Sequence, residues 1–161
     1  MSRRWIFLFA VALCAGLHLP AAADGGIRGW GPRVGITSSP DQVYFGAHLD
    51  CGDFADRVRF QPNLEIGVGD GVTLAALNAE AAYRFRSDWG HWSPYVGGGV
   101  GLNITGNNEG LIHNSDTQLG ASALAGIEKG LGSGQRVFLE AKLGLVESPD
   151  LKLAIGWTFF H

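Results

Sequence analysis

Residues 151–161 read Leu-Lys-Leu-Ala-Ile-Gly-Trp-Thr-Phe-Phe-His and repeat with a period of two. Successive side chains of a β-strand point to opposite sides, so this period predicts a strand with one apolar and one mixed face. The apolar face would carry Leu151, Leu153, Ile155, Trp157 and Phe159. We interpret the segment as the closing strand of a transmembrane β-barrel whose apolar face contacts lipid.

Seven further segments share this alternation, and turn residues separate them. Each has an apolar face and a second face of polar residues and glycines. Many short alternating segments are typical of a transmembrane barrel. The segments are Trp30–Thr37, Gln42–Cys51, Arg57–Val68, Val72–Arg86, Ser93–Ile104, Thr117–Lys129 and Arg136–Leu145.

The sequence therefore predicts an all-β fold, an eight-stranded antiparallel up-and-down transmembrane β-barrel with a polar, side-chain-filled interior. Because eight is an even number, both chain ends should lie at one end of the barrel. We expect an irregularity at Pro62, which cannot donate a hydrogen bond to a neighbouring strand. Thr105–Asp116 is the longest polar connection and the one with room for recognition.

Residues 1–23 predict a signal peptide. Two arginines precede the apolar run Trp5–Leu19, and three alanines at 21–23 provide a cleavage site. The apolar run is too short to span a bilayer comfortably as a helix. We expect cleavage after Ala23, which leaves residues 24–161 as a single outer-membrane β-barrel domain; an uncleaved membrane anchor is the alternative.

Cleavage would leave ten Lys and Arg residues against fifteen Asp and Glu residues, a net charge of −5. With no basic patch to collect phosphates, the composition gives no indication of nucleic-acid binding. Cys51 would be the only cysteine, so no intrachain disulfide can form.

The glycine-rich character of the mixed face indicates which side points inward. Gly97, Gly99 and Gly101 would cover little as an outer surface, whereas inside a narrow barrel they leave room for larger side chains. A soluble lipocalin-like barrel with the opposite orientation is the alternative. The mixed face also holds charges that can pair: Glu65, Glu80, Glu128 and Glu140 with Arg33, Arg59, Arg84, Lys142 and Lys152. We expect Lys152 to pair with Glu140 on the adjacent strand.

Most aromatic residues fall near strand ends or turns on the side of the chain termini. Aromatic girdles of this kind lie at the interfaces of membrane barrels. The residues are Trp30, Phe54, Phe60, Tyr83, Phe85, Trp89, Trp92, Tyr95, Trp157 and Phe159.

Three features together resemble the small eight-stranded outer-membrane β-barrel superfamily of OmpA/OmpX-like and opacity-type proteins. They are the signal peptide, the stretch Pro94–Gly101, and the ending Gly156–His161. The family ends in an aromatic residue, usually Phe, where this chain has His161. The resemblance implies a location in the Gram-negative cell outer membrane with both termini periplasmic. It also implies contact with outer-membrane lipid and lipopolysaccharide, and the barrel-assembly machinery as a partner during biogenesis.

Several polar groups invite a functional interpretation. His113 and Ser115, with Glu128 or Glu140, contain the residue types of a hydrolase triad, and lipid A deacylases of similar architecture carry a His-x-Ser motif. Three aspartates, Asp50, Asp53 and Asp56, could hold a cation, but a solvated acidic turn is the simpler interpretation. His48 has no companion metal ligand and is expected to form an interior hydrogen bond.

We therefore expect no catalytic, cofactor-binding or metal-binding residues, and no cofactor. The predicted function is that of a monomeric, non-enzymatic integral outer-membrane protein with a structural or interaction role at the bacterial surface. A narrow porin-like channel is the first alternative, and a lipid A-modifying barrel enzyme is the second.

Overall fold

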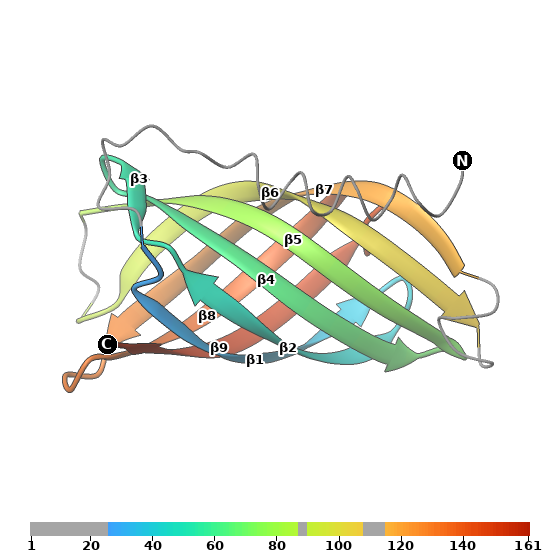
Figure 1. Ribbon diagram of the computed structural model, residues 1–161, viewed down its shortest axis with the longest axis horizontal. Helices are drawn as coiled ribbons and strands as arrows, with labels where there is room; N and C mark the ends of the chain where they lie inside the picture. Colours follow the sequence, from blue (N-terminus) through green and yellow to red (C-terminus); the bar gives the residue numbers. More distant parts are fainter. Residues whose placement is uncertain (1–25, 87–89, 108–114) are drawn as a thin grey trace.

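The computed structural model describes residues 26–86, 90–107 and 115–161. The predicted signal peptide, Trp89 and His113 lie outside these residues. The described chain forms a barrel of tilted antiparallel strands (Figure 1). The strands are β1 (Gly29–Ser38), β2 (Gln42–Asp50), β3 (Asp53–Ala55), β4 (Val58–Gly69), β5 (Val72–Arg84), β6 (Ser93–Asn107), β7 (Ser115–Gly130), β8 (Gln135–Val146) and β9 (Leu151–Phe160).

Each long strand pairs with its neighbours in sequence, and two pairings close the barrel. β9 pairs with β1, where Phe160 lies opposite Gly29, and β2 pairs with β4 past the short β3. The predicted eight-stranded up-and-down barrel is confirmed. Because Gly29 and Phe160 are paired, β1 begins and β9 ends at the same end of the barrel. We call this the terminal end.

The closing strand has the predicted two faces. The five residues of its apolar face are 37–47 % exposed, whereas Lys152, at 7 %, and the alternate positions up to Thr158 are buried. The other long strands share this orientation, with large apolar side chains outside and polar side chains inside. Among the described residues, no helix is long and apolar enough to cross a membrane.

The turn between β4 and β5 shows how local sequence sets the register. Only Asp70 and Gly71 connect the two strands, and both have positive φ angles, 49° and 69°. A two-residue turn of this type requires positive φ at both positions, which Asp tolerates and Gly favours. The turn places Gly69 opposite Val72 and fixes the pairing of both strands.

The strands differ from the sequence expectations at β3 and at the 105–116 connection. The short β3 was not predicted, because three residues show no alternation. The 105–116 connection is shorter than expected, since β6 continues to Asn107 and β7 begins at Ser115. The polar residues near 105 and 116 predict a loop, but a strand that lines a polar interior carries polar residues on one face, so they do not show where the strand ends. The irregularity expected at Pro62 is found on one side only: the β2 ladder ends beside it, at Asn63, whereas the register with β5 continues through it.

Candidate functional site

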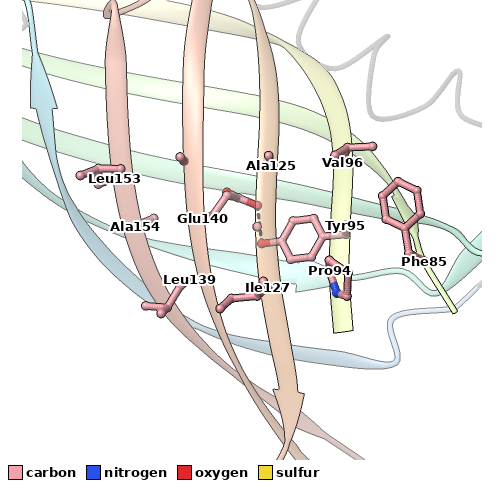
Figure 2. A pocket seen from close by; sticks show the side chains of 12 residues that line it. Phe85, Pro94, Tyr95, Val96, Ala125, Ile127, Leu139, Glu140, Leu153 and Ala154 are labelled. Carbon is pink, nitrogen blue, oxygen red and sulfur yellow. Dashed lines mark hydrogen bonds between the residues drawn. The ribbon is translucent and has the colours of Figure 1, made fainter. Parts of the chain in front are cut away.

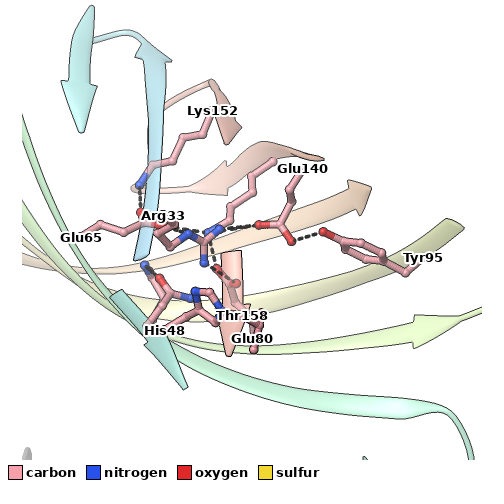
Figure 3. A network of polar contacts seen from close by, with 11 residues as sticks. Arg33, His48, Glu65, Glu80, Tyr95, Glu140, Lys152 and Thr158 are labelled. Atoms are coloured by element: carbon pink, nitrogen blue, oxygen red, sulfur yellow. Dashed lines mark hydrogen bonds and ion pairs between the residues drawn. The ribbon is translucent and has the colours of Figure 1, made fainter. Parts of the chain in front are cut away.

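The centre of the barrel is an ion cluster around Arg33 of β1 (Figure 3). The Arg33 guanidinium is fully buried and contacts three carboxylates on three other strands. Its Nε lies 3.3 Å from Glu65, its Nη1 lies 3.5 Å from Glu80, and its Nη2 donates a 2.5 Å hydrogen bond to Glu140. One side chain thus joins β1 to β4, β5 and β8 across the interior.

Two lysines complete this central cluster. Lys142 Nζ lies 3.1 Å from Glu65 and 3.8 Å from Glu140, and it also pairs with Glu80. Lys152 Nζ donates a 2.9 Å hydrogen bond to Glu65. The expected Lys152–Glu140 pair is wrong. Lys152 lies opposite Lys142 in the strand register, and Glu140 lies opposite Ala154, so Lys152 reaches across the barrel instead.

A second cluster lies nearer the terminal end. Glu128 pairs with Arg59 and lies 3.6 Å from Arg136, which also pairs with Asp50. All four residues are buried. The two clusters together contain five cations and five carboxylates, so the interior charge is balanced. Removing one member would leave a buried charge without its partner, which is strongly destabilising.

The predicted acidic turn is only partly solvated. Asp50 is 3 % exposed. One of its carboxylate oxygens pairs with Arg136, and the other accepts a hydrogen bond from the Gly52 N–H. Asp53 pairs with Arg84 at the rim of the barrel. The expected pairing of Arg84 with the interior glutamates is therefore wrong. The Arg136–Asp50 pair was missed. Strand alternation places both side chains inside the barrel, because Arg136 shares a face with Glu140 and Asp50 shares one with His48, but it does not show that they meet.

Aromatic rings fill the space beside the interior cations. Arg59 lies over the Tyr95 ring at 5.0 Å, Arg33 over Phe138 at 5.6 Å, and Lys152 over Tyr44 at 5.4 Å. These contacts are cation–π interactions, which strengthen away from water. Tyr95 is 1 % exposed and donates a 2.9 Å hydrogen bond to Glu140, so its predicted place in the outer girdle is wrong.

His48 occupies the interior position that the sequence predicted. Its side chain is 1 % exposed, and its Nε2 forms a 2.9 Å hydrogen bond with Thr158 Oγ1. The imidazole also packs edge-on against Phe138, with centroids 5.2 Å apart. These contacts link β2 to β9 and β8.

The β8–β9 turn covers the interior at the end opposite the termini. Glu147 O accepts a hydrogen bond from Asn103 Nδ2, and Pro149 is buried against Gly144. A hollow beneath this turn, lined in part by Glu80, has about 10 Å³ of free space, room for roughly one water molecule. Together with the two ion clusters, the turn confirms the prediction of a side-chain-filled interior.

Ser115 and the two glutamates of the hydrolase interpretation lie far apart, and His113 lies outside the described residues. Glu128 and Glu140 are held by arginines inside the barrel. Ser115 begins β7, thirteen positions before Glu128, a separation on the order of 40 Å along the strand. A triad requires its three groups in mutual contact, so neither Glu128 nor Glu140 can complete a triad with Ser115.

Cys51 lies just after β2, outside the long strands, and is partly buried. Burial, together with the negative charge of Asp50, raises the pKa of its thiol above the ordinary value. The thiol is therefore a weaker nucleophile than an exposed cysteine at neutral pH.

The outer surface carries an aromatic cluster at the terminal end. Trp30 and Trp157 both pack against Phe159, at centroid distances of 5.9 and 6.4 Å. Tyr83 packs against Phe85, and Phe54 against Phe60. Amphipathic rings of this kind suit the headgroup layer of a membrane. Apart from Tyr95, the girdle residues named from the sequence and described by the structure lie at this end.

A closed eight-stranded barrel with an apolar outside, a charge-balanced inside and an aromatic cluster at one end has the architecture of small outer-membrane barrels. Two solved structures of that class have the same fold. Neisserial surface protein A (NspA) matches with a TM-score of 0.66 and 14 % identity, over 83 % of this chain and 95 % of that one. The N-terminal β-barrel domain of Pseudomonas aeruginosa OprF matches with a TM-score of 0.60 and 18 % identity, over 84 % and 98 %.

No protein-family model matches the sequence, and no curated protein sequence matches it significantly. The similarity to the two solved structures therefore shows the fold of this chain alone.

Proposed function

We propose that this protein is an integral outer-membrane β-barrel with a non-enzymatic structural or interaction role at the bacterial surface. It is exported through a signal peptide cleaved after Ala23, inserted by the barrel-assembly machinery, and oriented with both termini in the periplasm. It acts as a monomer in contact with outer-membrane lipid and lipopolysaccharide.

The observation that supports this proposal most directly is the burial pattern of the strands. Trp30, Ile36 and Phe45 are 54–58 % exposed on the outside, whereas Arg33, Glu65 and the other ion-cluster residues are almost fully buried inside. A soluble barrel has the opposite pattern, because water favours charges outside. Lipid is the surroundings in which an apolar outer face and a polar inner face are both stable.

The connections opposite the termini support a structural role over adhesion. Three of them are short: residues 39–41, 70–71 and 147–150. The connections at the terminal end between β2 and β4 and between β5 and β6 are longer, whereas most membrane barrels have longer loops outside. Such short outer turns offer little area for a protein partner, and only the connection between β6 and β7 has room for one.

Gene deletion tests the physiological role. We expect the deletion strain to have a more permeable outer membrane, measured by uptake of an apolar dye, with an unchanged lipid A profile by mass spectrometry. Complementation with the wild-type gene should restore the barrier. An altered lipid A profile with an intact barrier would support an enzyme instead. Steady conductance of the purified protein in a planar bilayer would support the channel.

A further inference from the structure

A shallow groove lies on the outer face of β6, β7, β8 and β9 (Figure 2). Val96, Ala125, Ala141 and Leu153 form one row of paired residues across the four strands. The two alanines are the short members of this row and form the floor between the larger side chains. The groove has a volume of about 790 Å³, within the range of small-molecule sites.

The walls of the groove are apolar. Phe85 and Pro94 border it on one side, and Leu139 borders it on the other (Figure 2). Tyr95 and Glu140 also contact the groove, but the phenolic O–H of Tyr95 donates a hydrogen bond to Glu140 in the barrel interior. The lining therefore suits a hydrocarbon chain.

A cation lies beyond one end of the groove. Lys129 is four residues after Ala125 on β7 and shares its outward face, about 13 Å along the strand. Its ammonium group lies 5.9 Å from the Trp92 ring centroid. Among the described residues, no carboxylate forms an ion pair with Lys129. Strands of a membrane barrel tilt by about 40°, so about 13 Å along β7 corresponds to about 10 Å of membrane depth. Half of a bilayer core is about 15 Å thick, so Lys129 reaches headgroup depth when Ala125 lies about 5 Å or more from the mid-plane.

We propose that the groove binds an acyl chain of an anionic phospholipid from the inner leaflet, with the lipid phosphate on Lys129. This inference rests on the proposed membrane location and on periplasmic termini, which place Lys129 and Trp92 at the inner-leaflet surface. The lysine and the indole bind the headgroup as basic and aromatic residues do at membrane interfaces. A hydrocarbon chain can lie along the alanine floor of a shallow groove, whereas a second convex barrel would contact only its edges.

Native mass spectrometry of the full-length gene product, purified from membranes in detergent, tests the inference. Phosphatidylglycerol and phosphatidylcholine are added at equal concentrations, and bound lipid is counted. We expect the wild-type protein to retain phosphatidylglycerol preferentially. Lys129→Gln should lower that preference about fivefold, the effect of one basic residue near an anionic headgroup. Ala125→Leu, which fills the floor, should abolish retention of both lipids.

Ala47→Leu is the matched control, because Ala47 is an exposed alanine on the outer face of β2, away from the groove. It should retain lipid as the wild type does. If Ala125→Leu does not fold, Ala141→Leu replaces it. Equal retention by the groove and control variants would overturn the inference, as would an unchanged lipid preference in Lys129→Gln. If the wild-type protein is a dimer without bound lipid, and Ala125→Leu abolishes the dimer, the groove is occupied by a second copy of the chain.

Heat-dependent mobility of the wild-type protein on SDS gels, together with its presence in the membrane fraction, distinguishes failure of the lipid inference from failure of the proposed function. A heat-modifiable barrel in the membrane fraction with no lipid in the groove would overturn only the lipid inference. A protein that is folded and absent from membranes would overturn the proposed function as well.

Discussion

The ring of Phe138 on β8 lies over the bare backbone of Gly156, its register partner on β9. A Cβ atom on Gly156 would approach Phe138 Cζ to 2.2 Å. The same relationship holds for Tyr95 over Gly126 and for Tyr44 beside Gly35. The inward glycines therefore make space for aromatic rings, which in turn pack against interior cations.

Gly156→Ala should prevent correct folding, because Phe138 is 0 % exposed and its ring has no space to move into. We expect loss of the heat-modifiable band on SDS gels. Gly130→Ala is the control, since a Cβ there meets nothing within 4 Å. Adding Phe138→Leu to Gly156→Ala should restore part of the folded band. A fully folded Gly156→Ala variant would refute this packing relationship.

Arg33→Met should lower the free energy of unfolding by about 3–5 kcal/mol, because it leaves buried carboxylates without a partner. Arg84→Gln is the control. Its ion pair with Asp53 lies at the rim and is about one-third exposed, so its loss should cost about 0–1 kcal/mol. Urea unfolding of both variants in lipid vesicles, followed by tryptophan fluorescence, measures the difference. Equal unfolding midpoints would contradict the central role of Arg33.

The pairing of Lys152 with Glu65 predicts a specific coupling. In a double-mutant cycle, Lys152→Met with Glu65→Gln should show a coupling energy of roughly 0.5–3 kcal/mol. Lys152→Met with Glu140→Gln should show a smaller value, because no ion pair joins these two residues. The cycles compare urea unfolding free energies of single and double variants. A larger coupling with Glu140 would restore the pairing expected from sequence.

The raised pKa of Cys51 predicts slow alkylation in the folded protein. A raised pKa means less thiolate at a given pH, so the iodoacetamide rate should keep rising after the rate in urea has levelled off. Modification at Cys51, followed by mass spectrometry between pH 7 and 10, measures both curves. If the alkylation rates of the folded and the unfolded protein level off at the same pH, the pKa of the Cys51 thiol is not raised by the fold.

The sequence predicts the barrel well because strand alternation is a local signal. The closing strand shows this clearly, since Leu151, Leu153, Ile155, Trp157 and Phe159 all face outward as expected. Alternation also predicts which charges face inward, including Arg33, Arg59 and Lys142. It contains no information on which of these charges meet across the barrel.

Those partners depend on register and tilt, which follow from turns and closure. The adjacency of the two strands favours a Lys152–Glu140 pair, but the register places Lys142 opposite Lys152. The strand face of Arg84 predicts an interior position, yet Arg84 lies at the strand end, where it pairs with Asp53 of β3. A three-residue strand such as β3 leaves no periodic signal, so this rim contact could not be predicted.

The central claim is that the apolar outer face contacts lipid. Its most direct test is tryptophan quenching after reconstitution into vesicles with brominated acyl chains. Trp30 and Trp157 are 54 % and 39 % exposed on that face, so we predict strong quenching together with heat-modifiable mobility. A protein that folds in buffer without detergent and shows no quenching would contradict the claim.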